Sequence, residues 1–451
     1  MQQLIFILIS GTVGFIAFRQ YKKVFDNIKL GQSEDISDRK FVRWKNVLLV
    51  AFGQKKMFKN WIPAIFHLFI YTAFLFTQVE LIEILIDGIF GVHRFFSSFL
   101  GSFYTVVIST IEILSFFALI ATFVFLYRRN LLKVPRLVKS ELNGWPKLDA
   151  NLILLGELFL VTGIFTMNGA DVVLQSIDPM HYPATGSLAM SSMLGPLIFD
   201  SFEVQNLMLI ERIGWWLHLS VVLGFIVYLP ISKHLHIFLA FPNVYFSKLG
   251  PRGKMENMPA IMNEVKSMLG IESETINDSN TEMPEFGAND VFGLSWKNIL
   301  NAYTCTECGR CSAVCPANVT GKKLSPRKIM MDIRDRAEEV GRNISSGNMK
   351  YAKTKDNSAI KHLTGSNYDD GKSLFDYISR AEIHACTTCN ACVEACPVMI
   401  DPLEPILKLR RYEILTESAG PAEWVPMFTA MENSGSVWQI PEEREKWRTE
   451  M

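Results

Sequence analysis

The chain has 451 residues, 49% of them hydrophobic, and its 45 basic residues balance its 45 acidic residues. This hydrophobic content lies at the upper edge of what soluble proteins carry, which points to membrane-spanning segments. The balanced charge gives no reason to expect a nucleic-acid partner.

Five apolar runs are long enough to cross a membrane as helices. They lie at about residues 3–18, 61–86, 104–127, 151–174 and 213–240, and about 20 apolar residues cross the roughly 30 Å hydrocarbon layer. The first run has no basic residue ahead of it, and RQYKK follows it. We therefore expect a retained signal anchor, not a cleaved signal peptide.

The loops between these runs predict the orientation, because Lys and Arg near span ends stay on the cytoplasmic side. Segments 19–59 and 128–147 are rich in both residues, whereas 87–103 contains only Arg94 and 175–210 contains neither. The pattern predicts a multi-pass protein of the bacterial inner (cytoplasmic) membrane, in contact with lipid. Its N-terminus would lie outside, and everything after the fifth run would lie in the cytoplasm.

Histidines in the apolar runs are candidate haem ligands, because a b haem takes one neutral imidazole from each of two facing helices. His67 lies near the inner end of the second run, His218 near the outer end of the fifth, and His234 and His236 near its inner end. If the fifth run is one helix, His218 and His236 are five full turns apart and share a face, about 27 Å along the axis. His234 would lie on nearly the opposite side. We therefore expect His67 and His236 to bind one haem near the cytoplasmic face.

A second, outer haem at His218 has weaker support. The second run has no histidine about three turns beyond His67, where the sequence reads FTQVE. His93 and His181 lie in outer loops and could substitute, although loop histidines are usually solvated polar residues. The alternative for the whole set is that these histidines only snorkel or cap at the interface.

Three acidic residues, Glu80, Glu83 and Glu112, lie in the second and third runs toward the outer face. Ionisable residues at membrane depth are candidates for function. They could relay the protons of quinone chemistry or lie at the level of the lipid headgroups, and the sequence leaves both readings open.

A polar stretch at about residues 254–290 predicts a linker with one short helix. The motif C-x2-C-x2-C-x3-C-P then occurs twice, at Cys305, Cys308, Cys311, Cys315 and Pro316, and at Cys386, Cys389, Cys392, Cys396 and Pro397. These are all eight cysteines of the chain, which argues against a secreted disulfide framework. The spacing is that of a ferredoxin with two [4Fe-4S] clusters; structural zinc sites use pairs of cysteines instead.

The first three cysteines of each motif can surround one cluster, while the fourth starts a helix that points away. We therefore expect crossed ligation. Cluster 1 would be held by Cys305, Cys308, Cys311 and Cys396, and cluster 2 by Cys386, Cys389, Cys392 and Cys315. The sequence shows no catalytic nucleophile, phosphate loop or dinucleotide fingerprint, so we expect no flavin or nicotinamide site in this chain.

The segments CTECGRCSAVCPANVTGKKLSPRKI and CTTCNACVEACPVMIDPLEPILKLRR, with the tail MENSGSVWQIPEEREKW, resemble the iron-sulfur part of heterodisulfide-reductase-related proteins. There, two clusters feed a cysteine-rich catalytic domain. The front half, with SKHLHIFLAFPNVYF, resembles the b-haem gamma subunit of respiratory nitrate reductase. That subunit has two histidines on its second span, and only His67 matches here. Fused relatives continue into a domain rich in Cys-Cys-Gly motifs, so the end at Met451 implies a separate cytoplasmic subunit with that domain.

We predict a mainly α protein, with a five-helix transmembrane bundle followed by a cytoplasmic α-helical two-[4Fe-4S] ferredoxin-like domain. The expected divisions are a b-haem membrane domain at 1–245, a cytoplasmic linker at 246–298, the cluster domain at 299–403 and a partner-docking tail at 404–451.

The expected function is that of the electron-transfer subunit of a quinone-linked oxidoreductase complex. It would connect a cytoplasmic redox partner and the quinone pool through two [4Fe-4S] clusters and one, or at most two, b haems. The resemblance implies an electron-transfer flavoprotein or an organic-acid dehydrogenase as the partner. The alternative is a membrane-tethered ferredoxin or redox sensor without haem or quinone chemistry. A transporter is disfavoured, because no pair of discontinuous spans is evident.

Overall fold

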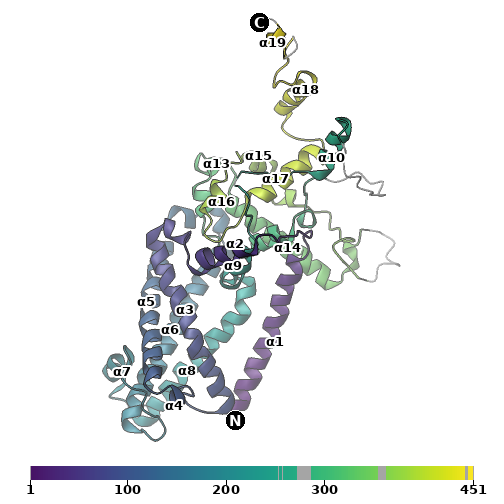
Figure 1. Ribbon diagram of the computed structural model, residues 1–451. Coiled ribbons are helices and arrows are strands. Elements are labelled where there is room, and N and C mark those ends of the chain that lie inside the picture. The colour runs from purple at the N-terminus through teal and green to yellow at the C-terminus, as the bar shows by residue number, and fades with distance from the viewer. Residues whose placement is uncertain are drawn as a thin grey trace.

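The computed structural model describes residues 2–251, 253–255, 257–271, 286–353, 362–441 and 445–449. Within these ranges regular structure is helical apart from two isolated β-bridges, which join Gln32 to Ser295 and Ala352 to Tyr368. A bundle of long helices carries the cysteine-containing region at one end (Figure 1), which confirms the expected fold class. Residues 272–285 of the expected linker and 442–444 of the tail lie outside the described residues.

Five helices of the bundle are long and apolar enough to cross a membrane. They are α1 (Gln2–Ile28), α3 (Trp61–Phe90), α5 (Ser102–Leu126), α6 (Trp145–Ile177) and α8 (Val204–Tyr228). Large apolar side chains face outward from them, such as Leu8 and Phe15 of α1, which are 61% and 63% exposed. An apolar exterior of this extent suits contact with hydrocarbon.

Shorter helices complete the described structure. They are α2 (Lys40–Asn46), α4 (Ser97–Leu100), α7 (Ser191–Phe199), α9 (His236–Tyr245), α10 (Pro259–Met268), α11 (Trp296–Thr304), α12 (Arg310–Ala313), α13 (Pro316–Val319), α14 (Pro326–Ser346), α15 (Arg380–His384), α16 (Ala391–Ala395), α17 (Leu403–Arg411), α18 (Val425–Ser434) and α19 (Lys446–Thr449). The end of the bundle that carries α4 and α7, opposite the cysteine region, is called the far side below (Figure 1).

The fifth predicted helix is interrupted, which corrects the expectation of one helix over 213–240. After α8, a 3-10 turn at Leu229–Ile231, an extended Ser232 and a second 3-10 turn at Lys233–Leu235 precede α9. His218 and His236 therefore lie on different helices. The argument from five turns on one helix face is wrong, and so is the placement of His234 on the opposite side.

The physical cause of the interruption is a proline together with a competing acceptor on α6. Pro230 has no N–H to donate to the preceding turn. The Asp149 carboxylate accepts hydrogen bonds from the Tyr228 hydroxyl at 2.5 Å, from Ser232 Oγ at 2.6 Å and from the Lys233 N–H at 3.1 Å. These bonds stabilise the turn after α8, and α9 leaves the bundle in a new direction.

Glycines allow α6 and α8 to approach closely. A Cβ at Gly163 would meet the His218 nitrogen at 2.8 Å, and one at Gly214 would meet the Met167 nitrogen at 2.5 Å. Small residues at helix crossings are typical of packing within membranes, where close backbone contact drives association. This crossing fixes His218 against α6.

The cysteine region rests on the end of the bundle. Val24 and Ile28 at the end of α1 share one apolar core with Ile299 and Tyr303 of α11. The Asn27 amide donates a hydrogen bond to the Tyr303 hydroxyl at 2.9 Å. The contact between bundle and cysteine region is therefore extensive and buried, while α18 and α19 extend away from it (Figure 1).

Candidate metal centres

The two cysteine loops share one backbone conformation. Glu307 and Gly309 in the first loop have φ values of 55° and 71°, and Thr388 and Asn390 at the matching positions of the second have 56° and 61°. Gly and Asn adopt this left-handed conformation readily, whereas Glu and the β-branched Thr rarely do. Such strain costs on the order of 1–3 kcal/mol and persists mainly at functional sites. Its repetition indicates that one structural requirement shapes both loops.

Two cavities divide the cysteines into two groups of four. One is lined by Cys305, Cys308, Cys311 and Cys396, and the other by Cys315, Cys386, Cys389 and Cys392. Each group combines the first three cysteines of one motif with the fourth of the other. The short helices α12 and α16, which carry Cys311 and Cys392, pack against each other and bring the motifs together. The grouping is the one expected for crossed ligation, which itself stays a prediction.

The chemistry of these groups fits iron-sulfur clusters. Burial raises the pKa of Cys305 and of Cys392 to about 12 and that of Cys396 to about 11, so their thiolates need a cationic partner such as iron. The Ile400 N–H donates to Cys396 Sγ at 3.3 Å, and the Thr388 N–H donates to Cys386 Sγ at 3.5 Å. Hydrogen bonds of this kind tune cluster potentials.

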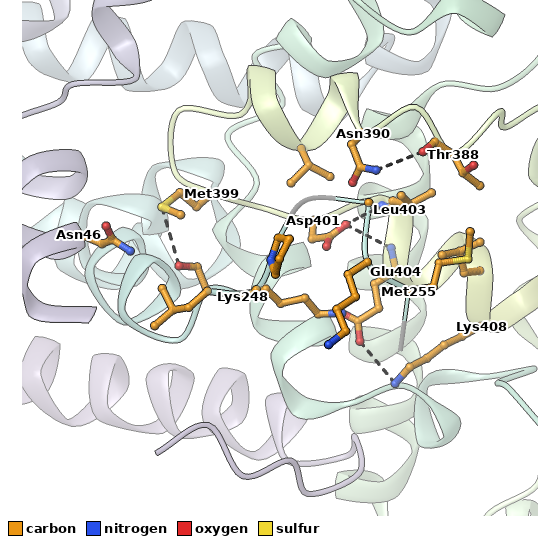
Figure 2. A pocket seen from close by; sticks show the side chains of 18 of the residues that line it. Asn46, Lys248, Met255, Thr388, Asn390, Met399, Asp401, Leu403, Glu404 and Lys408 are labelled. Atoms are coloured by element: carbon orange, nitrogen blue, oxygen red, sulfur yellow. Dashed lines mark hydrogen bonds and ion pairs between the residues drawn. The ribbon is translucent and has the colours of Figure 1, made fainter. Parts of the chain in front are cut away.

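The second group lies nearer the surface than the first. Cys389 is exposed, whereas Cys305 is 8% exposed. Beside the second loop, a cavity of 360 Å³ separates Thr388 and Asn390 from the chain that follows α9 (Figure 2). Its wall includes Glu404, whose carboxylate lies 3.1 Å from Lys248 Nζ (Figure 2). This cavity could not be predicted from the sequence, because its walls come from segments that are far apart in the chain.

Glu307, between the first two cysteines, connects the first loop to the bundle. Its carboxylate forms an ion pair with Lys233 Nζ and another with Arg334 Nη1 at 2.9 Å. Burial alone would raise the pKa of Glu307, but Lys233 and Arg334 outweigh burial and lower it. Lys233 lies in the turn that precedes α9, so the first cysteine loop and His236 share one buried network.

The rings of His67 and His236 face one another, as the sequence predicts for a pair of haem ligands. Their centroids are 6.4 Å apart. His67 Nδ1 lies 3.1 Å from Gln54 Oε1, and His236 Nδ1 lies 3.1 Å from the Lys233 carbonyl oxygen. These contacts engage Nδ1 of both rings, so Nε2 is the nitrogen through which either ring could ligate a metal. Burial also lowers the pKa of His236, which favours the neutral form that ligates metal.

The other histidines are arranged differently. His234 lies beside His236, with ring centroids 5.7 Å apart, and its Nδ1 is buried without a hydrogen-bond partner among the described residues. His218 is 1% exposed, and its Nδ1 lies 3.4 Å from the Leu160 carbonyl oxygen. In the described part of the chain no histidine ring packs against His218. The structure thus brings His67 and His236 together but does not supply a partner for an outer haem.

His93 and His181, the outer-loop histidines, pair with carboxylates instead of with each other. His93 Nε2 lies 2.9 Å from the Asp171 carboxylate, and His181 Nδ1 lies 2.9 Å from that of Asp178. Three residues of the site escaped sequence reasoning: Gln54, Lys233 and Glu307. The position of Glu307 inside the cysteine loop was a usable signal, whereas Gln54 and Lys233 carry no pattern of their own.

Comparison with known proteins supports the iron-sulfur assignment. A family model described as "4Fe-4S dicluster domain" matches residues 304–400. The "Probable iron-sulfur-binding oxidoreductase FadF" of Bacillus subtilis is 30% identical over 99% of this chain and 61% of its own length. The "EtfAB:quinone oxidoreductase" of Syntrophomonas wolfei is 25% identical over 86% of this chain and 51% of its own.

A third relative, the "Probable membrane-anchored ferredoxin" of Chromohalobacter salexigens, is 29% identical over 37% of this chain and 24% of its own length. No solved structure matches the chain. The chain therefore spans 61% of the length of the first relative and about half of that of the second. With a segment that matches the dicluster model and five membrane-type helices, the chain is similar over almost all of its length to an iron-sulfur-binding oxidoreductase.

Proposed function

We propose that the chain is a membrane electron-transfer subunit that connects a redox partner on the side of the cysteine region with the quinone pool. Its eight cysteines would hold two [4Fe-4S] clusters in the crossed arrangement, and His67 and His236 would hold one b haem. Such groups carry single electrons. In this proposal the cluster at the second cysteine group lies toward the surface, and the cluster at the first lies toward the bundle and the histidine pair.

The observation that carries this proposal is the buried link between the first cysteine loop and the histidine pair. Glu307 lies between Cys305 and Cys308, its ion-pair partner Lys233 is 8% exposed, and the Lys233 carbonyl oxygen engages His236 Nδ1. A tethered ferredoxin would not need such a connection. The link holds the first cluster site and the histidines in one rigid unit.

The surface near the second cysteine group suits a redox partner. Cys389 is exposed, and beyond it α18 exposes Val425, Phe428 and Met431 on one side of the helix at 59%, 42% and 50%. Exposed apolar side chains with helical spacing are typical of a docking surface. We propose residues 404–451 as that surface. A subunit with a Cys-Cys-Gly domain, an electron-transfer flavoprotein or a dehydrogenase would suit it, and the name of the Syntrophomonas relative favours the flavoprotein.

We propose that the cysteine region lies in the cytoplasm and the N-terminus outside the bacterial inner membrane, because basic residues concentrate in alternate loops. We propose the divisions 1–245, 246–298 and 299–403 for the haem, linker and cluster parts. Reaction of the reduced chain with quinone tests the function. The purified chain in lipid vesicles is reduced anaerobically, a menaquinone analogue is added, and oxidation of the clusters is followed by absorbance.

We expect rapid oxidation, and at least tenfold slower oxidation in His67→Ala and His236→Ala that keep full iron and sulfide contents. Equal rates in all three proteins would contradict the proposal. That result would support the alternative of a membrane-tethered ferredoxin or sensor, in which these histidines have no role.

A further inference from the structure

A cluster of buried carboxyl groups lies toward the far side of the bundle, remote from the cysteine loops. It consists of Glu80 and Glu83 of α3, Glu112 of α5 and Asp171 of α6, each of them at most 3% exposed. We call these four residues the far-side carboxyl cluster. Ionised groups inside a membrane-spanning bundle are energetically costly. Each of these four carboxyl groups therefore needs either polar or charged partners or a proton.

Glu83 and Asp171 have specific partners. Glu83 accepts hydrogen bonds from the Tyr104 hydroxyl at 2.7 Å and from the Phe96 N–H at 2.9 Å. Asp171 forms an ion pair with Arg94 Nη2 at 2.9 Å. Arg94 itself is 4% exposed, so this pair is buried on both sides.

Glu112 is also held firmly. Its carboxylate accepts hydrogen bonds from the N–H groups of Met190 at 2.8 Å and Ser191 at 3.1 Å, at the start of α7, and from the Asn168 amide at 3.3 Å. Backbone N–H groups at the start of a helix stabilise a negative charge. The Ser191 hydroxyl beside this carboxylate is buried and has no hydrogen-bond partner within the described ranges.

Glu80 differs from the other three. It is 1% exposed, and neither carboxylate oxygen has a hydrogen bond of standard geometry among the residues that the structure describes; the Asn168 amide lies near it only in a looser contact. Its charged neighbours are Arg94, Glu83 and Glu112. An ionised carboxylate that is buried without a partner is strongly destabilised, as any unpaired buried ion is. Glu80 is therefore the member of the cluster that is stable only with a proton.

The charge balance of the surroundings supports this assignment. Four carboxyl groups face the single guanidinium of Arg94, so full ionisation would leave three uncompensated negative charges. Arg212 of α8 is 40% exposed, and its guanidinium lies 3.7 Å from the buried carboxylate of Glu211. Its positive charge therefore compensates Glu211 and does not neutralise the cluster. Among the described residues, the other titratable groups that border the cluster are Tyr104, which donates to Glu83, Asp87 at the end of α3, His93 in the loop after it, and Tyr182 and Glu211 near Asp171.

His93 supplies a connection to water. Its side chain is 25% exposed, and its Nε2 lies 2.9 Å from Asp171 Oδ1. Asp171 and Asn168 both contact Arg94, and Asn168 contacts Glu112. The polar network thus runs from the far-side surface to the neighbourhood of Glu80, and an imidazole can pass protons at neutral pH.

We propose that Glu80 is a proton-exchange residue, protonated at rest and in exchange with far-side water through the network that ends at His93. This inference deepens the proposed function and rests on it for the identity of the reactant. Reduction of a quinone to a quinol takes two electrons, which the redox partner supplies, and two protons. Glu80 gives up its proton to a quinone oxygen and is reprotonated from far-side water, once for each proton. Oxidation of a quinol reverses both transfers.

The first test detects the proton without any activity. The whole chain in lipid vesicles is treated with dicyclohexylcarbodiimide, an apolar reagent that modifies protonated carboxyl groups, and labelled peptides are mapped by mass spectrometry. We expect label on Glu80 and none on Glu83 or Glu112. The matched control is Glu157→Gln, since Glu157 lies on α6 about 21 Å along the helix from Asp171; it should keep the Glu80 label. A protein labelled elsewhere in the bundle but not at Glu80 would overturn the proposal.

The second test separates this inference from the proposed function. In the quinone assay, Glu80→Gln should slow cluster oxidation about 100-fold, the lower range for loss of a proton-transfer group. Glu80→Asp should restore part of the rate and Glu157→Gln all of it, with cluster contents unchanged throughout. If the unaltered chain reacts and Glu80→Gln reacts equally fast, the proton-exchange role is wrong. If the unaltered chain itself fails to react, the proposed quinone function is wrong, and labelling alone decides whether Glu80 holds a proton.

Discussion

His67 and His236 come from segments far apart in the chain, yet their rings face one another at 6.4 Å with each Nδ1 engaged. Gln54 is the side chain that fixes His67, and its backbone is left-handed, with φ of 50°. The Gln54→Asn variant can adopt that backbone conformation, but its side chain is one methylene shorter and does not reach His67 Nδ1. We expect 10- to 100-fold weaker haem binding, the usual cost of losing a partner that orients a ligand.

The measurement for Gln54→Asn is the haem-to-protein ratio of the purified chain, with haem titration for affinity. Gln78→Asn is the matched control, because Gln78 lies on α3, the helix that carries His67, but donates to the Phe74 carbonyl oxygen of that same helix. Unchanged haem binding in Gln54→Asn would show that the contact does not position His67.

Crossed ligation makes a distinctive prediction for serine variants. Cys396→Ser should perturb the same cluster signal as Cys311→Ser, since these residues line one cavity. Cys315→Ser should perturb the same signal as Cys392→Ser, since these line the other. Electron paramagnetic resonance of the reduced variants distinguishes the two signals. Pairing of Cys396→Ser with Cys392→Ser would instead show that each motif binds its own cluster.

The close crossing of α6 and α8 can be tested with two glycines of one helix. A Cβ at Gly214 would meet the Met167 nitrogen at 2.5 Å, whereas one at Gly224 would meet nothing within 4 Å. Gly214→Val should lower the thermal midpoint in detergent by several degrees, because backbone atoms cannot move aside as a side chain can. Gly224→Val should leave it unchanged. Equal midpoints would mean that the helices separate without cost.

Lys297 of α11 gives a prediction for pH. It is 4% exposed and donates to the Asn243 and Asn301 side-chain oxygens at 2.7 and 2.6 Å. Burial lowers its pKa to about 7. Between pH 7 and the ordinary lysine value of about 10.4, the unfolded chain binds a proton that the folded chain lacks, so stability contributed by this group rises with pH.

The thermal midpoint of the unaltered chain should therefore increase between pH 7 and 9 more steeply than that of Lys297→Met. Differential scanning fluorimetry at matched ionic strength measures both slopes. Parallel slopes would show that Lys297 keeps its proton in the folded state throughout this range.

The membrane-type helices and the cysteine domain could be predicted, because both depend on patterns that are local in the sequence and not on packing between distant segments. Hydrophobic runs predicted all five membrane-type helices, and cysteine spacing predicted a dicluster domain that the family comparison supports. The break after α8 was not predictable in the same way. Pro230 hinted at it, but the bonds of Asp149 that stabilise the turn come from another helix.

The sequence analysis paired His67 with His236 from two arguments, their depth in the membrane and the helix face that His236 would share with His218. The structure brings the rings of His67 and His236 together, but the argument from a shared helix face of His218 and His236 was wrong, because these two residues lie on different helices. Lys233 and Gln54 could not be assigned from sequence, since their roles depend on which segments meet at the end of the bundle, whereas the position of Glu307 inside the cysteine loop was a usable signal. The same holds for Glu80, because only the folded chain shows that its carboxylate has no hydrogen bond of standard geometry within the described ranges.

The central claim is that His67 and His236 bind a b haem beside the first cluster. The direct measurement is the optical spectrum of the purified chain, reduced with dithionite minus oxidised in air, repeated on His67→Ala and His236→Ala. The account predicts a sharp b-type α band in the unaltered chain that is lost in both variants while iron-sulfur absorbance remains. An iron-loaded chain without this band, or variants that keep it, would contradict the account.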